Sequence, residues 1–338
     1  MPISRKIMGV SRGRVFTGAL SGTSTIATGT NPIGVCISAD GKSVYAVNYG
    51  GNTVNIFDRN TTTGALSGTS TIATGTYPQG ICISADGASV YTANGGNAGG
   101  NTASIFTRNT STGALSGTST IATGASPFGI VISADGASVY VSNNDSTVSI
   151  FSRNTSTGAL SGTSTISTTT LTQGICISAD GTSVYACRNG SALVHIFTRN
   201  TSTGALSGTS TIATGTTPKA ICISADGKSV YVANQGSDTL SIFDRNTSTG
   251  ALSGTSTIAT GSSPRGVCIS ADGGSVYASN YSGATVSIFA RNISTGALSG
   301  TSTIATGTSP QGICISADGT SVYTVNYTSG TVSIFTRS

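Results

Sequence analysis

Few side chains in this sequence could carry out acid–base or nucleophilic chemistry. The chain has one histidine, His195, and its eleven acidic residues are all aspartates. Seven of these aspartates stand in a repeated Ser-Ala-Asp-Gly sequence, and an Asp-Gly pair between two extended runs is typical of a tight hairpin turn. With only Asp145 and Asp238 outside turns and no Gly-x-Ser-x-Gly motif, we expect neither a paired-carboxylate site nor a serine-hydrolase site, and we predict no catalytic residues.

The cysteines are dispersed in the same regular way. Six of the seven occupy one equivalent position per repeat: Cys36, Cys82, Cys176, Cys222, Cys268 and Cys314. Equivalent strands of packed sheets lie about 10 Å apart, whereas a disulfide requires Cα atoms roughly 4.4–6.8 Å apart. We therefore expect reduced, buried thiols, with Cys187 also unpaired. The sequence contains no clustered ligand set, so we predict no metal site and no cofactor.

A thirteen-residue sequence, TGALSGTSTIATG, is repeated along the chain. It begins at Thr17, Thr63, Thr112, Thr157, Thr203, Thr249 and Thr295, with variation in the fourth copy. Between copies, each unit offers three further extended segments, and none shows the 3.6-residue apolar period of a helix. Seven units of four short antiparallel strands predict an all-β, seven-bladed β-propeller.

The order of segments predicts how the ring closes. The chain begins with one unit's fourth segment and ends with a third segment, so Ala19–Gly29 must join residues 312–336 to complete the last blade. We divide the chain into a basic N-terminal arm, residues 1–16, and the propeller, residues 17–338. The arm lacks the apolar core of a signal peptide, and no segment has the roughly 20 apolar residues of a membrane span.

The repeated motifs resemble a known family. P-x-G-[IV]-C-I-S-A-D-G-x-S-V-Y-x-x-N, followed by T-V-S-I-F-x-R-N and T-G-A-L, is similar to the YVTN repeat of lactonase-like seven-bladed propellers. The resemblance covers Thr17 to Arg337 and implies that GICIS is the innermost strand of a blade and ALSGTSTIATG the outermost. It does not determine activity, because this architecture carries both enzymes and binding proteins.

Differences between the units gather in two loops that must emerge on one face of the disk, around the mouth of the central channel. One loop leads into the inner strand, where the residue before Gly varies from unit to unit. The other joins the second and third strands and carries several tyrosines. Tyrosine rings beside amide and guanidinium donors suit a sugar or a polar protein surface. We predict a ligand-binding site formed by Tyr49, Tyr281, Tyr327, Gln79, Gln311 and Arg265.

The fourth unit is an outlier, and it defines an alternative function. It replaces the usual asparagine by Arg188 and introduces His195. A histidine on a strand packed between blades is usually structural, but a lactonase-like hydrolase would need His195 or Arg188 near the channel mouth. We keep this hydrolase as the alternative.

Charge and edge patterning suggest the main functional hypothesis. The repeats are close to neutral, which argues against nucleic acid as a partner. All seven outer strands lack charge, although exposed edge strands are normally protected by charged residues. The opening MPISRKIMG is similar to the start of some tailed-phage virion proteins. We therefore predict a non-enzymatic structural or receptor-binding propeller of a virion or extracellular surface, with a cytoplasmic location as the alternative. Its partners would be proteins docking on residues 1–16 and the rim, with a glycan or cell-surface ligand on the loops and no membrane insertion.

Overall fold

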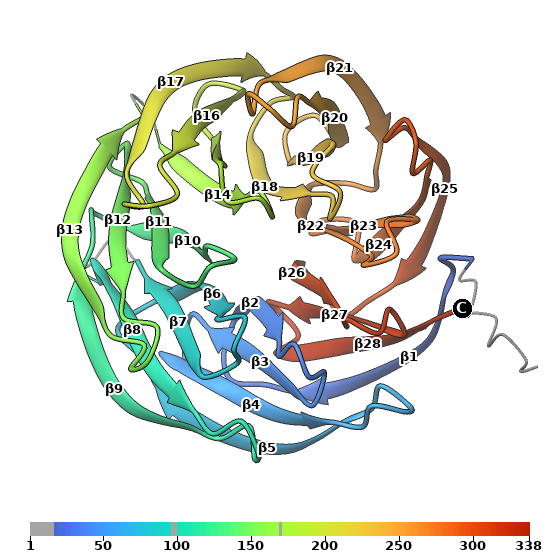
Figure 1. The fold of residues 1–338 in the computed structure, drawn as a ribbon. Helices are drawn as coiled ribbons and strands as arrows, with labels where there is room; N and C mark the ends of the chain where they lie inside the picture. Colours follow the sequence, from blue (N-terminus) through green and yellow to red (C-terminus); the bar gives the residue numbers. More distant parts are fainter. Residues whose placement is uncertain (1–16, 96–99, 169–170) are drawn as a thin grey trace, which may run out of the picture.

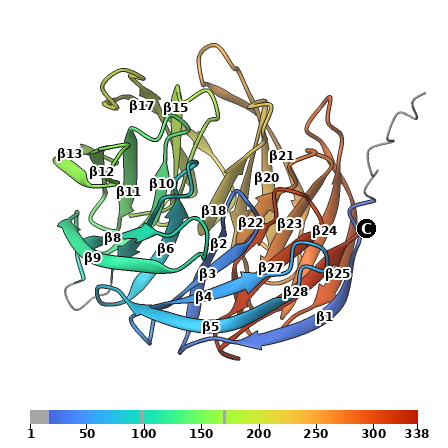
Figure 2. The ribbon, with the colours of Figure 1, turned by 60° about the horizontal axis from the view of Figure 1, so that its bottom comes forward.

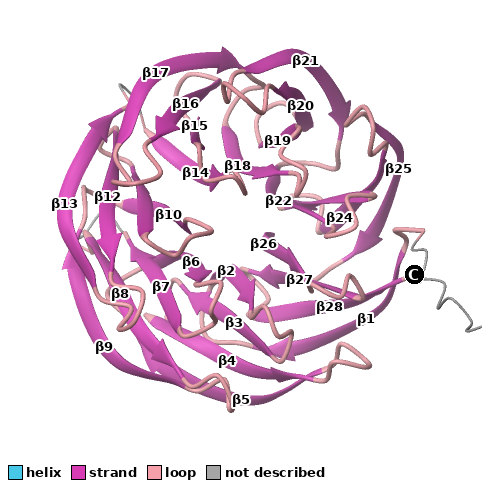
Figure 3. Cartoon of the chain, viewed as in Figure 1, coloured by secondary structure: helices cyan, strands magenta, loops and turns pink. Residues whose placement is uncertain are grey.

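The computed structural model describes residues 17–95, 100–168 and 171–338. These residues form 28 β-strands, arranged as a ring of seven four-stranded antiparallel sheets (Figure 1). The described residues contain strands, turns and loops but no helix (Figure 3). The predicted seven-bladed β-propeller is confirmed.

The strands occupy four equivalent positions in the blades. The inner strands are β2 (Pro32–Ile37), β6 (Pro78–Ile83), β10 (Pro127–Ile132), β14 (Thr172–Ile177), β18 (Pro218–Ile223), β22 (Pro264–Ile269) and β26 (Pro310–Ile315). The second strands are β3 (Ser43–Asn48), β7 (Ser89–Asn94), β11 (Ser138–Asn143), β15 (Ser183–Arg188), β19 (Ser229–Asn234), β23 (Ser275–Asn280) and β27 (Ser321–Asn326). The third strands are β4 (Thr53–Arg59), β8 (Thr102–Arg108), β12 (Thr147–Arg153), β16 (Leu193–Arg199), β20 (Thr239–Arg245), β24 (Thr285–Arg291) and β28 (Thr331–Arg337). The outer strands are β1 (Leu20–Ala27), β5 (Leu66–Ala73), β9 (Leu115–Ala122), β13 (Leu160–Ser167), β17 (Leu206–Ala213), β21 (Leu252–Ala259) and β25 (Leu298–Ala305).

Six blades are built from four consecutive strands, and the seventh joins the two ends of the described chain. We number blade 1 from β2–β5 to blade 6 from β22–β25; blade 7 consists of β26, β27, β28 and β1. In blade 7, Leu20 pairs with Arg337, and the Gly18 N–H donates to the Ser338 carbonyl at 2.9 Å. Figure 1 shows β1 (blue) beside β28 (red). The predicted closure of the ring is confirmed.

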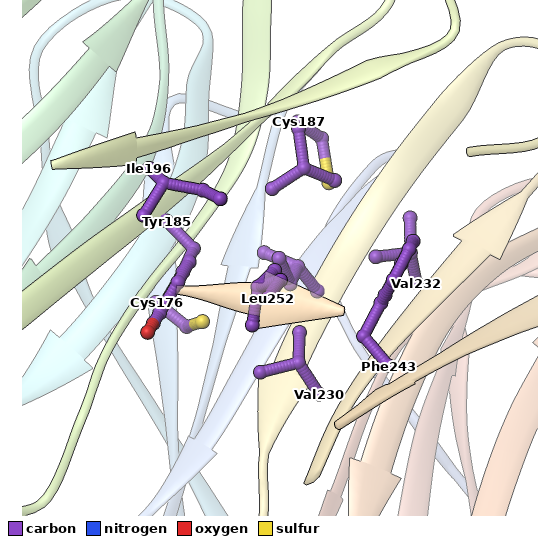
Figure 4. Close-up of a cluster of buried hydrophobic side chains, with 10 residues drawn as sticks. Cys176, Tyr185, Cys187, Ile196, Val230, Val232, Phe243 and Leu252 are labelled. Carbon is purple, nitrogen blue, oxygen red and sulfur yellow. The ribbon is translucent and has the colours of Figure 1, made fainter. Parts of the chain in front are cut away.

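The core lies between neighbouring blades rather than at one centre. Every residue of the second strands is buried, whereas most of each outer strand is exposed at the rim of the disk (Figure 2). At the junction of blades 4 and 5, Tyr185 and Cys187 of β15 belong to one buried cluster with Val232 and Phe243 (Figure 4). Because both faces of each sheet are covered in this way, the inner and second strands are rich in apolar residues.

An arginine at the end of each third strand clamps its blade to the preceding one. Nε of Arg245 in blade 5 donates to the Tyr185 hydroxyl of blade 4 at 2.7 Å, and its Nη2 lies 3.0 Å from Oδ2 of Asp180. The Tyr185 hydroxyl in turn donates to the carbonyl of Gly250 in blade 5, also at 2.7 Å. The seven ion pairs are Arg59–Asp318, Arg108–Asp40, Arg153–Asp86, Arg199–Asp135, Arg245–Asp180, Arg291–Asp226 and Arg337–Asp272.

The Ser-Ala-Asp-Gly aspartates therefore have two structural tasks. Within its turn, Asp180 accepts hydrogen bonds from the Ser178 hydroxyl and the Thr182 N–H. Across the junction, it accepts from Arg245. Burial by itself raises the pKa of Asp180, but these hydrogen bonds outweigh burial and lower the pKa to about 2. The Asp-Gly pattern predicts the turn, but the clamp depends on an arginine of the next blade.

Candidate functional site

One end of the central channel opens into a cavity of about 570 Å³, which we call the channel cavity. Residues from the inner strands of all seven blades line it. Hydrogen bonds tie together the two loops of each blade at this end, since the Tyr49 N–H donates to the Asn31 carbonyl at 2.9 Å and the Tyr281 N–H donates to the Ser263 carbonyl at 2.9 Å. A cavity of this size lies within the range of small-molecule sites.

The structure brings all six residues of the predicted ligand site to this cavity. Tyr49, Tyr281 and Tyr327 reach it from the loops after the second strands, and Gln79, Arg265 and Gln311 reach it from the inner strands. Their ligand binding stays a prediction.

Small residues on the inner strands allow the cavity wall to form. A Cβ added to Gly129 would lie 2.6 Å from the Gln173 carbonyl of the next blade, so a side chain does not fit at Gly129. The residue before this position, which is Ala220 in blade 5 and glycine in the other blades, lines the cavity in six blades: Ile33, Gln79, Phe128, Lys219, Arg265 and Gln311. The seventh, Gln173, is buried and does not line it.

Aromatic rings form one side of the mouth. We call Tyr49 and Tyr327, whose ring centroids lie 6.5 Å apart, the tyrosine arc. The Tyr77 ring is tilted by 35° to that of Tyr49, with the two centroids 5.0 Å apart. The pKa of the Tyr327 hydroxyl is raised, mainly by burial and to a smaller extent by the neighbouring Tyr49 and Tyr281. Tyr77, which contacts Tyr49, was absent from the predicted site, although its unit alone has an aromatic residue at this place, in GTYPQG.

Two cations form another side of the cavity. Lys219 of β18 and Arg265 of β22 come from adjacent blades, and both are half-buried. The pKa of Lys219 is lowered to about 8, mainly by burial and to a smaller extent by the charge of Arg265. Burial also lowers the pKa of Arg265. Lys219 was absent from the predicted site, although it occupies the second position of its inner strand, which varies from unit to unit.

Arg265 is held without a carboxylate. Its guanidinium carbon lies 3.6 Å from the centroid of the Tyr281 ring. With the Gln235 amide oriented so that its oxygen faces Arg265, that oxygen accepts hydrogen bonds from Nη2 at 3.0 Å and Nε at 3.3 Å. Among the described residues, the seven clamp arginines each pair with an aspartate, whereas Arg265 forms no such ion pair. No acidic side chain of the described chain lines the cavity. This geometry suits a ligand that carries negative charge.

The residues that the hydrolase alternative required do not reach the cavity. His195 lies on β16, 3% exposed, with Nε2 2.5 Å from the Thr168 carbonyl and its ring stacked 5.6 Å from that of Phe197. Burial lowers the pKa of His195. Arg188 ends β15 and is also buried. Neither lines the channel cavity, because both lie on strands packed between blades.

The remaining predicted features are placed as follows. All seven cysteines are unpaired, and burial raises the pKa of the Cys82 and Cys222 thiols to about 12. Within the described ranges, no group of three or more His, Cys, Asp or Glu side chains could hold a metal ion. A helix of the length and hydrophobicity needed to cross a membrane is likewise not found in the described part. The predicted docking arm, residues 1–16, lies outside the described residues.

Comparisons with known proteins identify the family and the fold. The family model described as lactonase, 7-bladed beta-propeller, matches residues 16–131, 69–173, 130–268, 209–305 and 256–338, which together span the propeller. A search of curated protein sequences found no match.

Solved structures show the same fold at low sequence identity. Hydrazine synthase from Kuenenia stuttgartiensis is 19% identical with a TM-score of 0.72, covering 98% of this chain and 99% of that one. A provisionally assigned 6-phosphogluconolactonase from Bacteroides fragilis is 23% identical with a TM-score of 0.76, covering 94% and 91%. The periplasmic gluconolactonase of Pseudomonas aeruginosa is 19% identical with a TM-score of 0.75, covering 88% of each chain.

These findings correct the main functional hypothesis. The prediction of a non-enzymatic structural or receptor-binding propeller of a phage virion is wrong, because the family match and the gluconolactonase neighbours favour the lactonase-like alternative. The proposed similarity to tailed-phage proteins finds no support in these matches, and neither does a virion location. The physical basis of the error is that loop divergence was attributed to an external binding face, whereas these loops enclose a cavity with two half-buried cations.

Proposed function

The chain belongs to the lactonase, seven-bladed β-propeller family, and on that premise we propose that it hydrolyses a small anionic lactone in the channel cavity. The observation that carries the proposal is Arg265, a half-buried guanidinium that lines the cavity and is held by an amide oxygen and an aromatic face. A phosphate or carboxylate on the substrate would supply the missing negative charge. The names of two neighbours, a gluconolactonase and a provisionally assigned 6-phosphogluconolactonase, support a sugar lactone.

In the proposed mechanism, Arg265 binds the anionic group and the tyrosine arc contacts the sugar ring. Lactone hydrolysis requires that a water molecule attack the ring carbonyl carbon, that the developing oxyanion be stabilised, and that the ring oxygen leave as a hydroxyl. Neither a carboxylate nor an imidazole of the described chain lines the cavity, so Lys219 in its neutral form is the base that takes the proton from water. Its lowered pKa makes this form accessible near neutral pH. After proton transfer, the Lys219 ammonium can donate a proton to the leaving ring oxygen.

The proposal is tested by comparing two lactones. Hydrolysis of 6-phosphoglucono-δ-lactone and glucono-δ-lactone is followed in a pH-stat, with the spontaneous rate subtracted. We expect catalysis of the phosphorylated lactone and a loss of about tenfold or more in kcat/KM in Arg265→Gln, as for the loss of one charge-assisted contact. Glutamine already occupies this position in three other blades, so the variant is compatible with the fold. Lys228→Gln, on the exposed hairpin of blade 5, is the control. A protein that accelerates neither lactone above the spontaneous rate would rule out the proposal.

A location outside the cytoplasm stays a prediction. The periplasmic gluconolactonase among the structural neighbours supports it.

A further inference from the structure

Lys219 differs from the other described lysines in its surroundings. Lys42 and Lys228 are exposed on hairpins, whereas Lys219 is half-buried and lines the channel cavity. Within the described chain, its Nζ has neither an ion-pair nor a hydrogen-bond partner. An amine placed in this way is open to a ligand.

The neighbouring charge and burial change the chemistry of this amine. Burial and Arg265 lower the pKa of Lys219 to about 8. At pH 7.5, roughly a quarter of such amines are neutral, compared with roughly one in a thousand at the ordinary lysine pKa. The neutral amine is the nucleophilic form, and at this pH its fraction at Lys219 is roughly 250-fold higher than at an exposed lysine.

We infer that Lys219 is a covalent binding site for small anionic aldehydes, which it captures as imines while Arg265 holds the anionic group. The inference goes beyond lactone hydrolysis and does not depend on it, because it requires only the amine, the adjacent cation and the cavity. The tyrosine arc and Phe128 add apolar faces to the same cavity, so an aldehyde attached to an aromatic ring fits the site well.

The capture step is a condensation. The lone pair of the neutral Nζ attacks the aldehyde carbon, and the carbonyl π electrons move to oxygen, which takes up a proton to give a carbinolamine. The nitrogen then loses its protons in forming the C=N bond, and the hydroxyl leaves as water. Amine and aldehyde thus become imine and water with no net oxidation or reduction. Arg265 remains protonated throughout and contributes charge alone.

The test uses two aldehydes that differ in charge. The full-length protein is incubated at pH 7.5 with 4-carboxybenzaldehyde or the uncharged 4-(hydroxymethyl)benzaldehyde. Sodium cyanoborohydride supplies hydride to the imine carbon and fixes the adduct as a secondary amine. Intact-protein mass spectrometry gives the rate of labelling, and peptide mapping gives its position. Lys219→Gln removes the amine with a residue that three other blades carry, and Lys228→Gln is the matched control.

The α-amino group of the chain has an ordinary pKa of about 8 and is therefore also labelled, which peptide mapping separates. Among the lysines we expect one fast adduct, at Lys219, lost in Lys219→Gln and kept in Lys228→Gln. The rate of labelling at Lys219 should be roughly 250-fold higher than at Lys42 or Lys228, following the neutral fractions. The uncharged aldehyde and the Arg265→Gln variant should each label Lys219 at least about tenfold more slowly. Equal labelling of the three lysines, or labelling unchanged by Lys219→Gln, would overturn the inference. Fast labelling of Lys219 that ignores both the aldehyde's charge and Arg265 would overturn the anion requirement. A protein without lactonase activity that still captures the aldehyde would refute the proposed function alone.

Discussion

At the scale of single residues, the contrast among the arginines is the most informative feature. The seven clamp arginines are almost fully buried and are neutralised by aspartate across a blade junction. Arg265, by contrast, is only half-buried, and Gln235 contacts its guanidinium through a neutral amide oxygen. The side chain is thus oriented while its charge remains available to a ligand. Gln235 acts through Arg265 and is a positioning residue.

Gln235→Glu should neutralise the charge of Arg265, so that this charge is no longer available to a ligand. A carboxylate at this position would form with Arg265 the kind of ion pair that the clamp arginines already make, and it would repel an anionic ligand. We expect binding of 6-phosphogluconate, measured by calorimetry, to weaken by about tenfold or more. Gln235→Asn, which retains the amide, is the control. Unchanged binding in Gln235→Glu would show that the charge of Arg265 does not select the ligand.

Lys219 gives a prediction about pH. Because the folded-state pKa of Lys219 is lowered to about 8, the neutral base accumulates as pH rises through that value. We expect the enzymatic part of kcat/KM for the phosphorylated lactone to increase through about pH 8 and then level off. In Lys219→Gln this increase should disappear, while Lys228→Gln should retain it. A profile with its midpoint well below pH 7 would assign the base to another group.

At the scale of elements, contacts between blades explain the repeated TGAL motif. Gly250, just before β21, has a φ of +73°, and its carbonyl accepts the Tyr185 hydroxyl. A Cβ added there would lie 2.2 Å from the Ser183 Oγ of the preceding blade. The glycine therefore meets both a conformational and a steric requirement, which is why each unit has one at this place.

Gly250→Ala should lower the free energy of unfolding by about 2–3 kcal/mol, because alanine is strained at this φ and displaces Ser183. Gly190→Ala is the matched control, since Gly190 is exposed, has a φ outside the left-handed region and has no atom within 4 Å of an added Cβ. Urea unfolding followed by circular dichroism measures both variants. Equal effects of the two substitutions would contradict this explanation of the glycine in TGAL.

At the scale of the whole molecule, the ring is held by seven equivalent junctions, and each contains an aspartate whose pKa is lowered. A carboxyl group with a lowered folded-state pKa contributes stability that is complete above its unfolded pKa, near 3.9, and is lost as pH falls through the folded value. The pKa values of about 2 for Asp180 and Asp318 set the lower end of the pH range over which this stability is lost.

We therefore expect the ring to lose stability progressively between about pH 4 and pH 2, as the clamp carboxylates are protonated. Acid titration followed by near-ultraviolet circular dichroism of the buried tyrosines measures this loss. Asp180→Asn should reduce stability at pH 7 and weaken its dependence on pH in this window. Asp58→Asn, on an exposed position of β4, is the control. Stability that stays constant from pH 5 to pH 2 would contradict the clamp model.

The sequence by itself determined the seven units, the four strands in each and the closure by β1, because hydrophobic runs and Asp-Gly turns are local signals that seven copies repeat. It also brought six cavity residues together, since variation between copies marks the loops of one face. Only the tertiary structure decided that these loops enclose a cavity. It also decided that Lys219 and Arg265 both line this cavity and that His195 does not line it. Burial and the partner of a charge depend on residues from adjacent blades, and no local pattern records them. Gln235 lies 30 positions from Arg265. The clamp aspartates lie 64 to 68 positions from their arginines or, at the ring closure, 259.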